Sequence, residues 1–136
     1  MSGELCAKEI FDIADESGAL LIVDEAHSSG VIGKKLLGIF EYYKITPRLN
    51  HIKMGTLGKA YGSYGAYILA SSQIISFLEN RGKPIIYSTA PSVIDTALAL
   101  VNIETVAQKS AKYYNRIQKR YTLIENILGI KAKSLI

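Results

Sequence analysis

The sequence Ala19-Leu20-Leu21-Ile22-Val23, followed at once by Asp24, decides the fold of this 136-residue chain. The apolar run shows no alternation with polar residues, which is typical of a strand buried on both faces. Such strands belong to parallel sheets that are covered by helices. In open α/β sheets, ligands bind beyond the carboxyl ends of the strands. We therefore expect Asp24 to emerge where chemistry takes place.

Apolar periodicity outside this run predicts helices alternating with strands. We expect helices over residues 5–17, 40–44, 72–81 and 92–128, the last as one long helix or as two with a break near Gln108. We expect strands at 19–23, 51–55, 64–70 and 84–87, and a loop with three glycines at 28–38. The first helix should bury a face made of Leu5, Ile10, Ile13 and Ala14, and Gly18 should end it. This order of elements predicts an α/β fold without internal repeats or linkers.

Composition excludes several classes of protein. Apolar residues make up 49% of the chain and charged residues 21%, as in ordinary globular domains. The net charge of +4 is mild, and the one basic cluster has the spacing of a solvated helix face: Lys109, Lys112, Arg116, Lys119 and Arg120. Cys6 is the single cysteine, so no disulfide and no cysteine zinc site forms within the chain. We expect a cytoplasmic protein with no metal, nucleic-acid or membrane partner.

A glycine-rich turn around Lys59 carries the second chemical signal. Residues 56–65 follow the pattern T-x-G-K-x-x-G-x-x-G, which places Lys59 among small and apolar residues. A partly desolvated lysine gives up its proton more readily, as Schiff-base chemistry requires. With Asp24 and His27 upstream, the chain offers the amine, carboxylate and imidazole that a pyridoxal phosphate enzyme uses. Without that chemistry, Asp24 would cap a loop, and Lys59 would be a solvated charge.

The segment Asp24-Glu25-Ala26-His27 also matches the Walker B box of a helicase family. A helicase needs a phosphate loop of the form G-x-x-x-x-G-K-[ST]. Gly33-Lys34 fails this pattern, because Ser28 and Lys35 replace the first glycine and the hydroxyl residue. Gly58-Lys59 fails it in the same way, through Lys53 and Ala60. We therefore reject a helicase.

Both segments resemble the α-oxoamine synthase family of fold-type I pyridoxal phosphate enzymes. The resemblance implies an aminotransferase-like sheet flanked by helices and a homodimer. It implies that Lys59 is the catalytic residue that holds the cofactor, while Asp24 meets the ring nitrogen and His27 the phenolic oxygen. Thr56 is implied to bind the cofactor as well. Ser88 and Thr89 match a pair that reaches the cofactor phosphate of the other subunit, although they could instead cap the next helix, a role for which Ser92 competes.

The implied reaction condenses an amino acid with an acyl thioester and releases carbon dioxide. The run Ile86-Tyr87-Ser88-Thr89 favours the biotin-pathway members, which use L-alanine and a pimeloyl thioester. Members that use glycine or serine (2-amino-3-ketobutyrate ligase, 5-aminolevulinate synthase and serine palmitoyltransferase) share the same core residues and stay open.

The resemblance covers only the central part of such an enzyme. Residues 1–136 correspond to the centre of its large cofactor-binding domain. A glycine-rich cofactor segment, a ring-stacking histidine and a small C-terminal domain with a substrate-binding arginine are expected outside it. We expect the 136 residues alone to be inactive, and a truncated, non-catalytic product is the alternative.

Overall fold

A three-stranded mixed sheet organises the computed structural model, which describes residues 7–129. The sheet order is β1 (Leu21–Asp24), β2 (His51–Thr56) and β3 (Ala66–Leu69). Strands β1 and β2 are parallel, with Asp24 opposite Met54, whereas β3 is antiparallel to β2. The expectation of a parallel sheet is therefore wrong for β3. Residues 57–65 are too short for a parallel crossover, which needs about a dozen residues or more.

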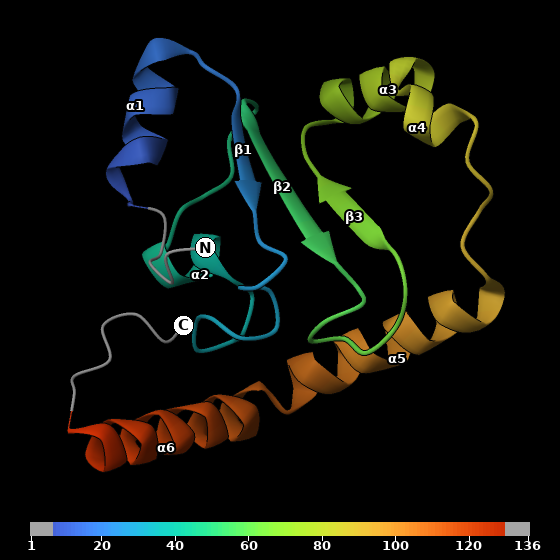
Figure 1. Cartoon of the computed structure of the whole chain (residues 1–136). Helices are drawn as coiled ribbons and strands as arrows, with labels where there is room; N and C mark the ends of the chain where they lie inside the picture. The colour runs from blue at the N-terminus through green and yellow to red at the C-terminus, as the bar shows by residue number, and fades with distance from the viewer. Residues whose placement is uncertain (1–6, 130–136) are drawn as a thin grey trace.

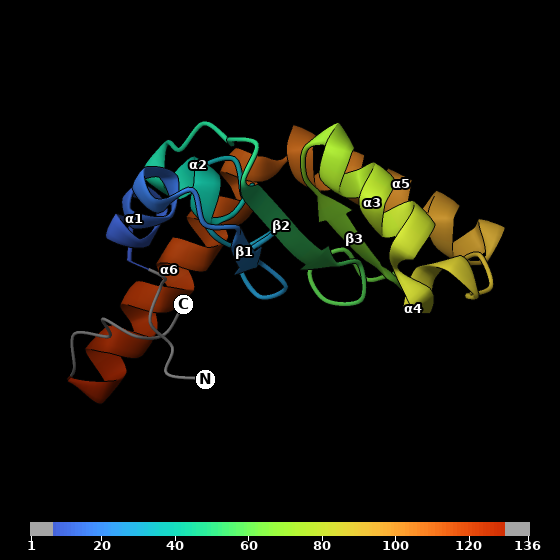
Figure 2. The ribbon, with the colours of Figure 1, turned by 90° about the horizontal axis from the view of Figure 1, so that it is seen from above.

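The helices lie on either side of this sheet. They are α1 (Glu9–Ser17), α2 (Ile39–Tyr43), α3 (Ser72–Arg81), α4 (Lys83–Ile86), α5 (Val93–Gln108) and α6 (Ser110–Leu128). Figures 1 and 2 show α1 and α2 on the β1 side of the sheet and α3 and α4 on the β3 side. Of the two alternatives for residues 92–128, the structure has two helices with a break at Lys109, and Gly129 ends α6 in a left-handed conformation.

The hydrophobic core lies between α1, β1 and α2. It contains Phe11, Val23, Ile39 and Phe40, and the Phe11 and Phe40 rings meet edge to face at 5.1 Å. In α1 the buried residues are Phe11 and Ala14. The predicted face is therefore only partly correct, because Ile10 and Ile13 are 43% and 63% exposed; Leu5 lies outside the described residues. Gly18 ends α1 as predicted, with φ of 69°.

A buried histidine joins α1 to the start of β2. The His51 ring packs against Phe11 with centroids 5.6 Å apart. Its Nδ1 accepts a hydrogen bond from the Arg48 backbone N–H, so Nε2 carries the proton that faces Asp15 Oδ1 at 2.9 Å. The Arg48 side chain reaches the other carboxylate oxygen of Asp15 at 3.2 Å. These contacts fix where β2 begins relative to α1.

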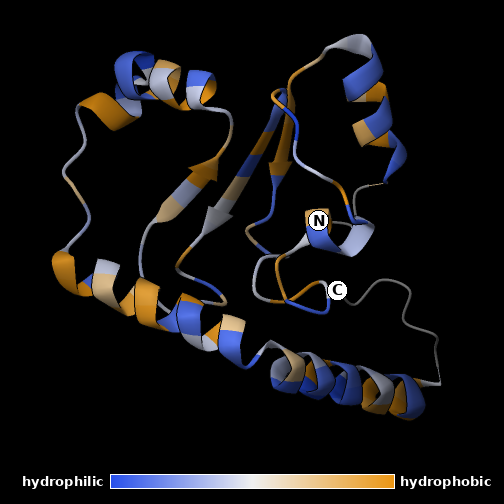
Figure 3. Cartoon of the chain, turned by 180° about the vertical axis from the view of Figure 1, so that it is seen from behind, coloured by the Kyte–Doolittle hydropathy of each residue, from blue (hydrophilic) through white to orange (hydrophobic). Residues whose placement is uncertain are grey.

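Two further expectations are corrected. Residues 84–87 do not form a strand, because Pro84 stands in the first turn of the short helix α4, where proline favours helix. The run that begins the sheet is not buried on both faces: Leu20 and Ile22 are 65% and 67% exposed, while Val23 is buried. Figure 3 shows the hydrophobic stretch along β1 and hydrophobic residues around α5. No described element covers that face of β1.

Glu25 directly follows β1 and is fully buried. Its backbone N–H donates to Met54 O at 2.7 Å, which continues the β1–β2 ladder by one step. Its Oε2 accepts hydrogen bonds from the Ile39 backbone N–H at 2.8 Å and from the Ser28 hydroxyl. Its Oε1 faces Lys53 Nζ at the ion-pair distance of 3.4 Å. A buried carboxylate is stable only when it is paired in this way.

The carboxylate of Glu25 leaves no room for a side chain at the start of α2. Gly38 has φ of 94°, and a Cβ atom there would overlap Glu25 Oε2. The same loop is held from outside by Glu41, whose carboxylate accepts from the Lys35 and Leu37 backbone N–H groups at 2.9–3.2 Å. The carboxylates of Glu25 and Glu41 therefore both hold the loop of residues 28–38 in place.

We predict that Glu25→Ala lowers the free energy of unfolding by about 3 kcal/mol, because the Ile39 N–H and the Ser28 hydroxyl lose a buried acceptor and Lys53 loses its counter-charge. Urea unfolding followed by circular dichroism measures the change. Glu16 is exposed on α1. Glu16→Ala is therefore the control and should stay within about 0.5 kcal/mol of the parent. Equal unfolding midpoints for the two variants would contradict the role of Glu25.

We also predict that Gly38→Ala destabilises the chain more than Gly18→Ala does. Both glycines have positive φ, but a Cβ at Gly18 would meet no atom within 4 Å. Gly18→Ala should therefore cost only the left-handed backbone term of about 1–2 kcal/mol. Gly38→Ala adds a collision with Glu25 in a backbone region that is essentially restricted to glycine. The same urea experiment compares them, and similar midpoints would show that Glu25 moves aside freely.

Candidate functional site

The candidate site lies where the parallel strands β1 and β2 end. Asp24 closes β1, His27 follows three residues later, and the turn with Lys59 follows β2. Because β1 and β2 are parallel, both segments leave the sheet at the same edge. There the Lys59 Nζ atom lies 2.7 Å from His27 Nε2, and both side chains are exposed. The pairing of the strands thus brings together two of the residues that the sequence motifs predict.

The turn that carries Lys59 is held by its own backbone and by Thr56. The Thr56 hydroxyl donates to Gly65 O at 3.1 Å and accepts from the Gly58 N–H at 3.2 Å. Gly62 and Gly65 have φ of 58° and 108°, a left-handed backbone that favours glycine. The expectation that Lys59 is partly desolvated is wrong for this chain, since its side chain projects from the turn into solvent.

Helix α5 anchors the same turn from the other side. Asn102 Nδ2 donates to Tyr61 O at 2.7 Å, and the Ser63 hydroxyl donates to Asp95 O at 2.7 Å. The Tyr61 side chain is buried beneath the turn, and this burial raises the pKa of its hydroxyl, with smaller contributions from Tyr67 and Glu25. No sequence signal separates Tyr61 from the other tyrosines, and Asn102 lies too far along the chain for a local pattern.

Asp24 has an exposed carboxylate at the end of β1. Its Oδ1 accepts a hydrogen bond from the Ala26 N–H at 2.9 Å, which is the loop cap expected of an aspartate without a chemical role. Its Oδ2 makes no hydrogen bond within residues 7–129. The same side chain therefore caps the loop with one oxygen and offers the other to a ligand.

Ser88 and Thr89 do not join this group. They follow α4 and are exposed, and the Ser88 hydroxyl donates to Ile85 O at 2.8 Å. Neither makes a contact with Lys59, His27 or Asp24 in the part of the chain that the structure describes. The cap of α5 is Ser92, which accepts from the Asp95 N–H at 3.0 Å. Neither Ser88 nor Thr89 therefore caps α5.

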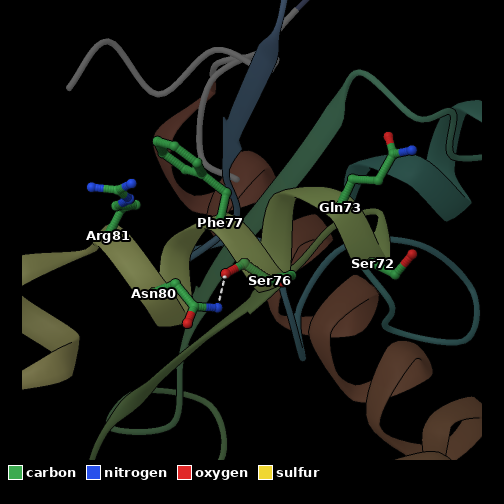
Figure 4. Close-up of a pocket in the computed structure, with 6 residues that line it drawn as sticks. All are labelled: Ser72, Gln73, Ser76, Phe77, Asn80 and Arg81. Atoms are coloured by element: carbon green, nitrogen blue, oxygen red, sulfur yellow. Dashed lines mark hydrogen bonds between the residues drawn. The ribbon is translucent and has the colours of Figure 1, made fainter.

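Two hollows of the surface lie away from this site. An apolar groove of about 1530 Å³ runs along β2 and β3, between residues such as Phe40, Tyr67 and Ile103. Figure 4 shows an open depression along α3, lined by Ser72, Gln73, Ser76, Phe77, Asn80 and Arg81. Neither hollow is lined by Lys59, His27 or Asp24.

In the described part of the chain, no three His, Cys, Asp or Glu side chains form a metal-binding group. Among the helices of residues 7–129, none combines the length and apolar character needed to cross a bilayer.

The donor set at the edge of the sheet fits pyridoxal phosphate. Lys59 supplies an accessible primary amine, and His27 supplies an imidazole within hydrogen-bond distance of it. Asp24 supplies a carboxylate with a free oxygen on the same edge. An amine for the aldehyde, an anion for the ring nitrogen and a partner for the phenolic oxygen are the groups that this cofactor requires of a protein.

Comparison with known proteins agrees with this chemistry. The chain is 42% identical over 133 residues to an 8-amino-7-oxononanoate synthase from Helicobacter pylori J99, a match that covers 97% of this chain and 36% of that protein. The solved structure of 8-amino-7-oxononanoate synthase from Francisella tularensis has a TM-score of 0.76 at 28% identity, over 93% of this chain and 38% of that one.

A serine palmitoyltransferase from Sphingomonas wittichii has the same fold, with a TM-score of 0.81 at 22% identity, over 98% of this chain and 35% of that one. These matches confirm the predicted α/β fold and the resemblance. The chain spans about a third of the length of these relatives. Residues 6–134 match the aminotransferase class I and II family, and the chain belongs to that family of pyridoxal phosphate enzymes.

Proposed function

We propose that this chain is the cofactor-binding centre of a pyridoxal phosphate-dependent acyltransferase of the 8-amino-7-oxononanoate synthase type. Such an enzyme condenses L-alanine with a pimeloyl thioester, releases carbon dioxide and serves biotin synthesis. The observation that carries the proposal is the 2.7 Å contact between Lys59 Nζ and His27 Nε2 on the edge that Asp24 shares. The identity of 42% to a relative with this name supports the choice of reaction.

The site residues have distinct roles in this proposal. When bound, pyridoxal phosphate supplies an aldehyde and an electron-withdrawing ring. Lys59 holds the cofactor through its amine and, once released from it, moves a proton to and from the substrate α-carbon. Asp24 presents its free carboxylate oxygen to the ring nitrogen. His27 faces the phenolic oxygen, and Thr56 supports binding by holding the glycine-rich turn in shape.

We further propose that the whole protein is a cytoplasmic homodimer. Ser88 and Thr89 are exposed and make no hydrogen bond with Lys59 of their own chain within residues 7–129. This placement supports a role for them at the cofactor phosphate of a second copy. We also propose that residues 1–136 form the centre of the large domain. The exposed apolar face of β1 supports this, because Leu20 and Ile22 have the character of buried residues but no described cover.

The proposal predicts that this chain works inside a relative. We expect a hybrid in which it replaces the matching 133 residues of the Helicobacter pylori protein to consume L-alanine and pimeloyl thioester. Lys59→Ala should abolish turnover, by about 10³-fold or more, because no other group supplies both the attachment point and the proton transfer. Product analysis by mass spectrometry measures turnover. Borohydride reduction and peptide mapping locate the lysine that holds the cofactor.

Lys34 provides the matched control, because it is an exposed lysine on the loop between β1 and α2. Lys34→Ala should leave turnover of the hybrid unchanged. A Lys59→Ala hybrid that still carries the borohydride label on another lysine would remove the basis of the proposal. A hybrid that uses glycine or serine in preference to alanine would assign the chain to a sister enzyme. A folded hybrid without any turnover would favour the non-catalytic alternative.

Asp24→Asn in the same hybrid should keep the cofactor attached to Lys59 and lose most of its turnover. The amide retains the shape of the side chain, but it carries no negative charge to hold the ring nitrogen protonated. The absorbance of bound cofactor and the rate of product formation report the two effects separately. Asp12→Asn is the control, because Asp12 is exposed on α1. Normal turnover in Asp24→Asn would show that Asp24 serves only as the loop cap.

A further inference from the structure

An exposed lysine raises a chemical problem for the proposed attachment of the cofactor. An ammonium group has no free electron pair, so it must lose a proton before it attacks an aldehyde. Burial would favour the neutral amine, but the Lys59 side chain is exposed. The turn itself therefore does not explain how this lysine becomes a nucleophile. A base next to Nζ is another known route to an activated nucleophile.

The structure places one base beside Nζ. His27 Nε2 lies 2.7 Å from it, and no other side chain lies within hydrogen-bond distance of Nζ among residues 7–129. The contact is compatible with two arrangements that differ by one proton. In the first, the ammonium donates to the free electron pair of Nε2, and in the second, the imidazolium donates to the neutral amine. If both groups were protonated, two donors and two positive charges would face each other at this distance.

We propose that His27 is the proton acceptor that activates Lys59 for capture of the cofactor. One proton moves from Nζ to Nε2, and the electron pair of the broken N–H bond stays on Nζ as the nucleophile. His27 becomes the imidazolium, so the total charge of the pair does not change and no further reactant is needed. The inference rests on the proposed role of Lys59 as the attachment point, and it gives His27 a task before any cofactor is bound.

The fold supports this assignment through the rigidity of the segment that carries His27. The backbone N–H groups of Ser28 and Ser29 both donate to Glu25 O, at 3.1 and 2.9 Å, and close a tight turn around Ala26 and His27. The buried Glu25 side chain binds the same turn through the Ser28 hydroxyl. The imidazole therefore projects from a fixed turn towards the turn that carries Lys59. The two anchored segments meet at this contact of their side chains.

The test is the reactivity of the Lys59 amine in the full chain without cofactor. A small amine-specific reagent such as trinitrobenzenesulfonate labels the lysines, and peptide mapping gives the rate at Lys59 relative to that at Lys34. We expect His27→Phe to lower this ratio by roughly tenfold. General bases contribute 10²–10⁴-fold in enclosed sites, and water replaces part of that contribution at an exposed pair. Circular dichroism checks that the variants remain folded.

A second variant separates proton transfer from simple orientation. His27→Gln keeps a hydrogen-bond acceptor for the ammonium but cannot take up its proton. We expect it to react as slowly as His27→Phe. A wild-type ratio in His27→Gln would reduce His27 to an orienting residue, and an unchanged ratio in both variants would overturn the inference. Because the reagent replaces the cofactor, these outcomes do not depend on whether the hybrid enzyme condenses alanine.

Discussion

The buried carboxylate of Glu25 is the constraint on which the rest of the structure depends. It joins three segments of the chain: its own turn at Ser28, the start of α2 at Ile39 and strand β2 at Lys53. An uncompensated buried charge would be strongly destabilising, so these three segments must stay together for the fold to persist. His27 belongs to the turn that Glu25 holds, and Lys59 follows the strand that Lys53 holds. Glu25 thus helps to hold in place both segments that carry the site.

Short sequence patterns correctly predict the elements that a few neighbouring residues determine. The predicted helix at Ser72–Arg81 agrees with the structure because a serine cap and a helical period act within a few residues. The predictions are wrong where other parts of the structure determine the conformation or the burial of a segment. Two isoleucines suggested a strand at 84–87, but Pro84 and Gly82 begin a helical turn. The apolar run before Asp24 suggested burial on both faces, and burial depends on neighbours that no local pattern specifies.

The site was predictable as a set of residues but not as an arrangement. The motifs indicated Asp24, His27 and Lys59, whereas the 2.7 Å contact follows from the parallel register of β1 and β2. No motif in the sequence indicates the importance of Glu25, although one signal is present. Alternation along β1 places Glu25 on the same side as Val23, and that side is buried. An acidic residue in phase with a buried strand position indicates a paired carboxylate.

This alternation also explains why two adjacent acidic residues have opposite tasks. Side chains of successive residues in an extended segment point to opposite faces, and the ladder between β1 and β2 continues through the Glu25 N–H to Met54 O. Glu25 therefore turns inward and fixes the loop, while Asp24 turns outward and keeps one carboxylate oxygen free for a ligand. Exchanging the two faces would require a shift of register by one residue, which would also move Val23 out of the core. The hydrophobic pattern of the strand thus determines which carboxylate supports the fold and which one serves the site.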